Sequence, residues 1–287
     1  MKKKSQALET VVHGVFLLLG LITVGCVLLI SVYLIVSGIP AIRQIGLIPF
    51  LFGKTWASTA AEPSYGILPF ILTSVYGTAG AIVLGVPIGF LTAVYLAKVA
   101  PPRIRGVMSA AVSLLAGIPS VVYGLVGMLV LVPGIRKAFH LADGASLFAA
   151  IVVLAIMILP LIMRTAEEAL IAVPDSYREG SFGLGAGRLR TVFRIVLPAA
   201  GPGILSGVIL GIGRIVGETA ALIFTAGTMA QIPGLFQSGR TLAIHMYVLS
   251  GEALHMNEAN ATAVVLLLVV LLMNTLSALA AKKLTKK

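Results

Sequence analysis

Charged side chains are scarce in this sequence, and their scarcity argues against an ordinary soluble domain. Asp, Glu, Lys and Arg make up only 11% of the 287 residues, whereas hydrophobic residues make up 59% and the mean hydropathy is +1.07. An average soluble domain has about 25% charged residues. A soluble protein of this composition would expose large apolar patches, so the expected solvent is the lipid bilayer.

Cysteine is almost absent, and no catalytic constellation is present. Cys26 stands alone, which excludes an intrachain disulfide and a cysteine-based zinc site. The chain also lacks a glycine-rich phosphate loop ending in Lys-Ser or Lys-Thr. We therefore expect no cofactor, no metal and no ATP hydrolysis by this chain. The histidines are scattered without metal-ligand spacing: His13, His140, His245 and His255.

Acidic residues are few, and the basic excess has a simple explanation. The chain has 10 Asp and Glu against 21 Lys and Arg, which gives a net charge of +11. A basic protein can bind nucleic acid. Here the positive charges lie in short segments between apolar runs, as orientation signals of membrane proteins do. We expect membrane lipid as a partner, and no nucleic acid.

Six apolar segments are candidates to cross a bilayer, which takes about 20 residues of helix. The predicted fold is therefore all-α, a polytopic membrane protein with six transmembrane helices. The predicted spans are 16–36, 67–96, 107–132, 146–163, 204–226 and 259–281.

The distribution of Lys and Arg predicts the orientation of these spans. Fifteen of these residues fall on the side that carries both termini, five fall on the other side, and Arg214 lies within a span. This asymmetry places both termini in the cytoplasm. The predicted organisation is a short cytoplasmic N-terminus at 1–15, the first span at 16–36, an extracytoplasmic loop at 37–66, a five-helix core at 67–281 and a cytoplasmic tail at 282–287.

The cytoplasmic segment 164–200 is the most polar part of the chain. Pro174-Asp175-Ser176 indicates the start of a short helix, with Asp175 or Ser176 as its N-cap, and Gly185 allows a reversal after it. A second helical stretch is expected over 188–196, ended by Pro198. A short rigid helix flanked by glycines could seat in a groove of a partner. The alternative is a solvated loop with orienting arginines.

Arg214 and Glu218 are a charged pair inside the fifth predicted span. A charge at the bilayer centre is costly, so both side chains are expected to face a bundle interior or a watery cavity. Their spacing of four residues places them on one helix face. They could form a purely structural ion pair, or they could line a path together with Thr219, because arginine's fork of donors suits an oxyanion.

Four stretches resemble a known family. The spacing of Glu179, Gly180, Ser181, Gly185, Ile195, Leu197 and Pro198 resembles the cytoplasmic coupling loop of ABC-importer permeases, with Gly-Ser here in place of the usual Ala-Ala. The segment from Leu115 to Gly124 and the segment from Gly213 to Thr219 resemble the phosphate (Pst) permeases. The stretch from Phe50 to Phe70, with Trp56 and Tyr65 suited to a membrane interface, resembles the PstC branch, with PstA as the alternative.

This resemblance implies a type I ABC-importer permease that carries inorganic phosphate across the cytoplasmic membrane of a bacterium or archaeon. The implied partners are a second homologous permease, a dimeric ATP-binding subunit and an extracytoplasmic phosphate-binding protein. Asp175 and the coupling signature would contact the ATPase, and Arg214, Glu218 and Thr219 would line the path. The implied pore-packing residues are Gly117, Pro119, Ser120 and Tyr123.

Three other functions fit parts of the sequence. The chain could be an ABC permease for another oxyanion or a small solute. It could be a secondary transporter with Glu218 as a proton relay, although no internal repeat is visible and such a transporter needs no coupling loop. It could also be a membrane scaffold in which Arg214 and Glu218 only hold helices together.

Overall fold

The predicted multi-pass, all-helical architecture is confirmed. The computed structural model describes residues 2–252 and 255–285, so the last two residues of the predicted tail lie outside the described part. Six helical segments of the described chain are long and apolar enough to cross a membrane. They are Val11–Ile45, Leu68–Lys98, Ser120–Ala138, Leu147–Ile171, Arg188–Val216 and Met256–Ala280.

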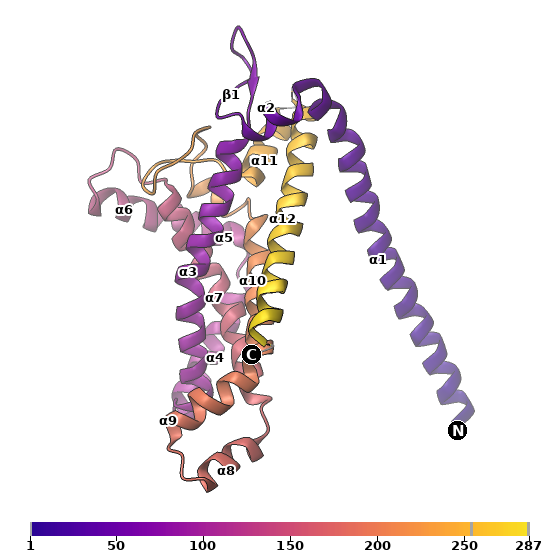
Figure 1. Ribbon diagram of the computed structural model, residues 1–287, viewed down its shortest axis with the longest axis vertical. Helices are drawn as coiled ribbons and strands as arrows, with labels where there is room; N and C mark the ends of the chain where they lie inside the picture. The colour runs from indigo at the N-terminus through magenta and orange to yellow at the C-terminus, as the bar shows by residue number, and fades with distance from the viewer. Residues whose placement is uncertain (1, 253–254, 286–287) are drawn as a thin grey trace.

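The elements follow one another in an elongated bundle (Figure 1). The first half contains α1 (Lys2–Ile45), α2 (Leu47–Phe52), the strands β1 (Trp56–Ala57) and β2 (Ser64–Tyr65), α3 (Leu68–Lys98), α4 (Pro102–Gly117), α5 (Ser120–Val126), the π-helical turn η1 (Gly127–Leu131) and α6 (Val132–Ala138). The second half contains α7 (Leu147–Ile171), α8 (Asp175–Gly183), α9 (Arg188–Thr191), the π-helical turn η2 (Val192–Val196), α10 (Leu197–Val216), the 3₁₀ turn η3 (Leu222–Phe224), α11 (Leu242–Glu252) and α12 (Met256–Thr285).

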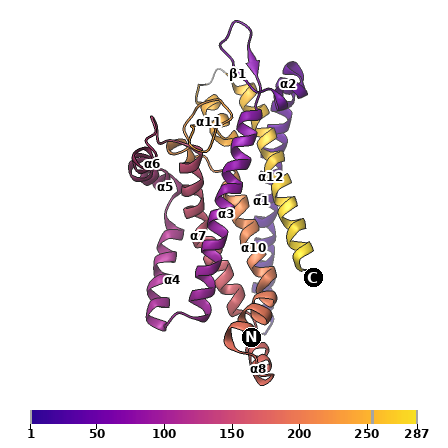
Figure 2. The same ribbon diagram turned by 60° about the vertical axis from the view of Figure 1, so that its left-hand side comes forward.

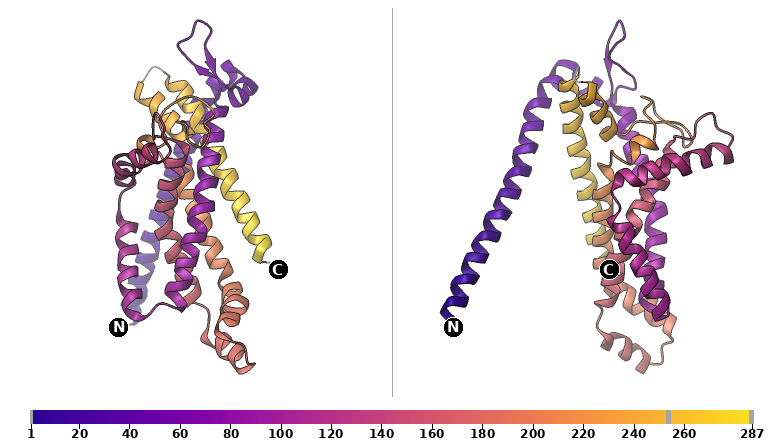
Figure 3. Two further views of the ribbon diagram at one scale, coloured as in Figure 1. Left: turned by 90° about the vertical axis from the view of Figure 1, so that its left-hand side faces the viewer. Right: turned by 180° about the vertical axis from the view of Figure 1, so that it is seen from behind.

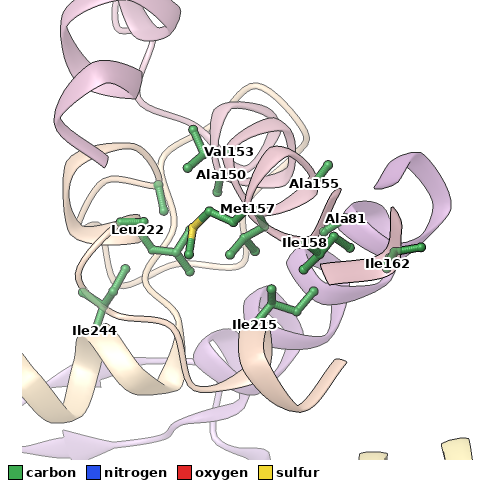
Figure 4. Close-up of a cluster of buried hydrophobic side chains, with 13 residues drawn as sticks. Ala81, Ala150, Val153, Ala155, Met157, Ile158, Ile162, Ile215, Leu222 and Ile244 are labelled. Carbon is green, nitrogen blue, oxygen red and sulfur yellow. The ribbon is translucent and has the colours of Figure 1, made fainter. Parts of the chain in front are cut away.

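Helix α7 is the centre of the bundle. In its most apolar stretch of 18 residues, 67% of the residues are buried inside the bundle. The helix contacts α3, α4 and α10. Glycines of α3 let the α7 isoleucines approach closely, as at Gly85, where an added Cβ would lie 2.8 Å from Ile158 Cδ1. Small residues at helix contacts are typical of membrane bundles. Figure 4 shows the resulting core, in which Met157 and Ile158 of α7 lie near Ile215 of α10 and Leu222.

The contact between α7 and α10 predicts a steric effect at Gly207. A Cβ at Gly207 would collide with the hydroxyl of Thr165 on α7, whereas Gly201 on the same helix has nothing within 4 Å. We expect Gly207→Val to destabilise the fold by roughly 1–3 kcal/mol through overpacking. Gly201→Val is the control, because both variants place the same β-branched side chain in α10. The measurement is the thermal inactivation midpoint of the purified complex, and equal midpoints for the two variants would contradict this packing.

Helix α1 leaves the bundle as a separate arm (Figures 1 and 3). It contacts α12 near its own end, where a Cβ at Gly38 would lie 2.7 Å from the carbonyl oxygen of Asn260. No residue of its most apolar stretch is buried, and α1 extends beyond both ends of the predicted span 16–36. Apolar side chains along this arm therefore need lipid or another subunit to cover them.

The third predicted span, a single helix over 107–132, is wrong. Helix α4 ends at Gly117, and α5 begins at Ser120 after an extended Ile118 with ψ of 128°. A proline disfavours the helical conformation of the residue before it, so Pro119 breaks the helix at Ile118. After it the chain continues sideways through α5 and α6 (Figures 2 and 3).

Polar contacts join the ends of α3, α4 and α7 near the segment that carries α8. Arg105 of α4 forms an ion pair with Glu167 of α7 at 3.1 Å. Lys98 Nζ of α3 donates to the carbonyl oxygen of Leu170 at 3.0 Å. Because α8 follows α7 after a short link, a displacement of α8 would be transmitted to all three helices.

Candidate translocation and coupling sites

Arg214 lies at mid-depth in the bundle. It is in the last turn of α10, and the adjacent Ile215 is buried against the cluster that contains Ile158, near the middle of α7. Arg214 itself is exposed on the isolated chain. An exposed guanidinium at this depth cannot face lipid without a large cost, so its surface must border a second protein or a hydrated path.

The predicted placement of Arg214 and Glu218 on one helix face is wrong, and the ion pair that was one of the two alternatives does not form. Helix α10 ends at Val216, with Gly217 as its C-cap, so Glu218 lies beyond the helix and not on its face. The Glu218 carboxylate instead accepts a hydrogen bond from the backbone N–H of Ala221 at 3.1 Å. No described acidic side chain forms an ion pair with Arg214. The guanidinium therefore keeps its donors for a ligand or a partner.

The turn after α10 brings together the two motifs of the predicted site. The Thr219 hydroxyl donates to the Gly217 carbonyl at 3.4 Å, which keeps the turn local. Gly124 of α5, next to Tyr123, packs directly against Ala221 in this turn. The Tyr123 hydroxyl donates to the Leu115 carbonyl at 2.8 Å, across the break between α4 and α5.

The other residues of the predicted pore-packing set lie around this break. Gly117 and Pro119 are exposed, and a Cβ at Gly117 would meet nothing within 4 Å. Ser120 is partly buried as the first residue of α5. These residues shape a bend, and any close packing they make must involve another subunit.

One apolar cavity is separate from Arg214. It has about 600 Å³ and lies along α5, η1 and α6, with Tyr123 and Ile135 among its lining residues. Neither Arg214 nor Glu218 lines it. An apolar cavity does not suit an oxyanion. Arg214 therefore lies outside this cavity, on the exposed surface of α10.

Helix α8 confirms the predicted short helix of the cytoplasmic segment. The predicted N-cap at Asp175 or Ser176 is wrong, because Pro174 is the N-cap and no side chain caps the helix. Asp175 lies in the first turn and forms an ion pair with Arg178 at 3.1 Å. Glu179 and Gly180 are exposed, and a Cβ at Gly180 would meet nothing within 4 Å. These positions are open to a partner.

A buried contact holds helices α8 and α9 of this segment together. Ser181 is buried and its hydroxyl lies 2.9 Å from that of Thr191, so Ser181 fixes α8 against α9. Gly185 has φ of +80°, a conformation that glycine adopts without strain. The reversal predicted at Gly185 is therefore confirmed.

Pro198 does not end a helix as predicted. It occupies the first turn of α10, and the helical chain continues from Arg188 through the π-helical turn η2 into α10. A π turn locally opens the helix and accommodates the missing N–H and the ring of a proline. Ile195 lies in this turn and is 38% exposed, while Leu197 is partly buried.

Large apolar side chains project from the same cytoplasmic segment, and sequence reasoning missed them. Leu184 is 91% exposed and Leu189 is 75% exposed, at the end of the molecule formed by α8 and α9 (Figure 1). Clustered exposed apolar residues mark interaction sites. We call this set the coupling patch, and it consists of Tyr177, Phe182, Leu184, Leu189 and Phe193.

The comparison with protein families agrees with this geometry. Residues 85–287 match the family described as binding-protein-dependent transport system inner membrane component. The chain belongs to this family. Its six apolar helices are thus those of an ABC-importer permease in the membrane.

Curated relatives cover most of this permease. It is 35% identical to the probable ABC transporter permease protein YqgH of Bacillus subtilis over 90% of this chain and 84% of that protein. It is 32% identical to the phosphate transport system permease protein PstC of Haemophilus influenzae over 80% of this chain and 78% of that protein. The phosphate transport system permease protein PstA 1 of Mycobacterium tuberculosis is 39% identical over 56% of this chain and 54% of that protein.

Solved structures share the fold of the permease. The chain matches a subunit of the MetNI methionine ABC transporter with a TM-score of 0.58 and 21% identity, covering 77% of this chain and 94% of that chain. A bacterial alginate ABC transporter matches with a TM-score of 0.59 and 16% identity, covering 77% and 80%. The predicted importer-permease architecture is therefore confirmed.

Glycine contacts of the permease also escaped the sequence reasoning. A Cβ at Gly124 would lie 2.7 Å from Ala221 Cα, so α5 touches the turn after α10 with almost no gap. Gly127 approaches Thr225 in the same way, with an added Cβ 2.7 Å from its Cγ2. The signal was present in the motif that contains Gly124, but its partner lies about 100 residues away in sequence, beyond the reach of a local pattern.

Proposed function

We propose that this permease carries inorganic phosphate into the cytoplasm as the PstC-type subunit of a binding-protein-dependent importer. The observation that carries the proposal is Arg214, a mid-depth guanidinium that is exposed and forms no ion pair with an acidic side chain of the described residues. Planar donors of this kind bind oxyanions in a bidentate way. Glu218 and Thr219 lie just after the end of α10, where the negative charge of Glu218 would temper the positive charge so that the anion can leave.

The proposed assembly pairs this chain with a second homologous permease. The arm α1 and the face of α10 around Arg214 are both exposed on the isolated chain, so other molecules would have to pack against them in the membrane. A pseudo-twofold pair of such permeases would place two facing walls around one path. The longer alignment with PstC relatives than with PstA relatives supports the PstC branch.

The proposed energy source is a separate dimeric ATPase at the cytoplasmic face. The open positions Glu179 and Gly180, with the coupling patch beside them, give that subunit a surface to bind. The chain itself would remain non-catalytic. The excess of Lys and Arg on the side of α8 supports cytoplasmic termini.

Uptake into proteoliposomes tests the substrate. The full complex, with its ATPase and phosphate-loaded binding protein, is expected to accumulate labelled phosphate in an ATP-dependent way. Labelled sulfate and molybdate are the matched oxyanion controls, each with the same complex. Accumulation of sulfate or molybdate but not phosphate would leave the permease function in place and overturn the substrate assignment.

A further inference from the structure

A small hairpin stands on the bundle at the end opposite to α8. Strand β1 pairs with β2 in antiparallel register, with Trp56 opposite Tyr65 and Ala57 opposite Ser64. The hairpin rises beyond the helices in every view (Figures 1, 2 and 3). Because α8 marks the cytoplasmic side, the hairpin projects into the extracytoplasmic space.

The base of the hairpin is anchored by aromatic rings. The indole of Trp56 stands edge-on to the ring of His245 on α11, with centroids 4.2 Å apart, and edge-on to Tyr65 at 5.4 Å. His245 in turn stacks on Phe70 of α3 at 3.9 Å. Phe70 and His245 are fully buried. The direction of the hairpin is thus set by two helices, and not by its own short strands.

Backbone contact reinforces this anchor. A Cβ at Gly53 would lie 2.7 Å from the Cα of Gly66, so the chain entering the hairpin touches the chain leaving it. Gly66 N–H donates to the Thr55 carbonyl at 2.9 Å, and the Ser64 hydroxyl donates to the same carbonyl at 2.7 Å. These contacts leave little freedom at the base.

His245 connects the anchor to the loop that follows Arg214. Its Nδ1 accepts a hydrogen bond from Arg240 Nη1 at 3.2 Å, since a guanidinium can only donate. Arg240 also donates through Nε to the Thr228 carbonyl at 3.0 Å. Burial, and after it the charge of Arg240, lower the pKa of His245 to about 2, so the imidazole stays neutral.

The other ring nitrogen of His245 is an unexplained polar group. Nε2 is buried and has no hydrogen-bond partner. Leaving a buried donor unpaired is costly, so an apolar side chain would stabilise this position better. A histidine at this position packs among the aromatic rings and also accepts the hydrogen bond from Arg240, which a phenylalanine could not do.

The tip of the hairpin has the character of a protein contact and not of a lipid anchor. Residues 58–63 read Ser-Thr-Ala-Ala-Glu-Pro, and those from Thr59 to Pro63 are exposed. A membrane-inserting tip needs large apolar or basic side chains, which this tip lacks. Small residues and one exposed carboxylate, Glu62, on a rigid stem suit contact with the polar surface of a folded protein.

We propose that the hairpin 54–65 is a docking arm for the extracytoplasmic substrate-binding protein, and that Trp56 and His245 relay its contact to the loop after Arg214. The choice of partner rests on the proposed function. The family is binding-protein-dependent, and the binding protein would approach the permease from its extracytoplasmic side. A second permease would lie beside the bundle, against the exposed faces of α1 and α10, and not at the end that carries the hairpin.

Cross-linking from the tip tests the docking directly. In a Cys26→Ser background, Thr59→Cys carries a photoreactive maleimide, and the purified complex receives its phosphate-loaded binding protein. Ile48→Cys, a 71% exposed position on α2, is the matched control. We expect a covalent adduct of the binding protein with Thr59→Cys and little with Ile48→Cys. An adduct only with the second permease or with lipid, or no adduct, overturns the proposal.

A shortened hairpin tests the relay. Because Ala57 pairs with Ser64, an Asn-Gly turn in place of residues 58–63 closes the hairpin with its base intact. We expect half-maximal stimulation of the ATPase to need about tenfold more binding protein, as when a central contact is lost, with basal ATPase unchanged. Unchanged concentration dependence overturns the proposal. The cysteine variant keeps the native hairpin, so docking is tested even if the shortened chain does not assemble.

These measurements separate the docking arm from the substrate assignment. Failure of the wild-type complex to import phosphate would overturn the proposed substrate, whatever the hairpin does. If the wild type imports phosphate but Thr59→Cys gives no adduct with the binding protein, the proposed function stands and the docking arm falls.

Discussion

Arg214→Ala is expected to reduce phosphate uptake at least about 30-fold while the complex still assembles. Truncating one partner of a desolvated charged hydrogen bond costs about 2–5 kcal/mol, and each 1.4 kcal/mol is a factor of ten. The side chain is exposed on the isolated chain and no described acid pairs with it, so its removal should leave the fold unchanged. The measurement is ATP-dependent uptake of labelled phosphate into proteoliposomes, beside co-purification of the other subunits.

Two further variants identify what Arg214 provides. Arg214→Lys keeps the charge and loses the planar fork, so uptake should be intermediate. Glu218→Gln keeps an oxygen for the Ala221 N–H and removes the negative charge, which separates its capping role from its electrostatic one. If Arg214→Ala also strips the ATPase or the second permease from the complex, Arg214 is structural and the pathway interpretation fails.

Leu184→Asp is expected to detach the ATPase. Leu184 is 91% exposed at the end of the molecule that carries α8, so the substitution should not disturb the chain itself. Burying a leucine in a partner is worth about 1.5–3 kcal/mol, and burying an unpaired carboxylate instead adds a further cost. Affinity for the ATPase should therefore fall by at least about tenfold.

The matched control for this variant is Leu184→Met, which keeps an apolar side chain of similar volume. Co-purification of the ATPase with the tagged permease gives the measurement, and thermal stability of the permease shows that folding is intact. Wild-type amounts of ATPase on the Leu184→Asp permease would show that the coupling patch does not face this partner.

The coupling loop shows how far local sequence reasoning reaches. The predicted helix over about 176–184 is α8 at Asp175–Gly183, and the predicted reversal is Gly185 with its positive φ. Both depend on interactions within a few residues, such as the dihedral preference of glycine and the start signal at Pro174. The burial of Ser181 against Thr191 depends instead on how two helical arms meet.

The charged pair marks the limit of such reasoning. A spacing of four residues places Arg214 and Glu218 on one face only while the helix continues, and α10 ends between them. The same limit applies to the outer loop. Trp56 and Tyr65 fit a membrane interface by residue type, yet both lie in an aromatic cluster at the base of the hairpin, with Trp56 against the buried His245.

The sequence by itself determined the solvent, the number of spans, the coupling helix and the family. Each of these follows from hydropathy, charge or motif spacing along one stretch of chain, which act locally and leave a periodic record. Only the tertiary structure decided where α10 ends, what Glu218 binds and how His245 ties a hairpin to the loop after Arg214. These features arise from contacts between distant segments, whose energies depend on packing that no local pattern encodes.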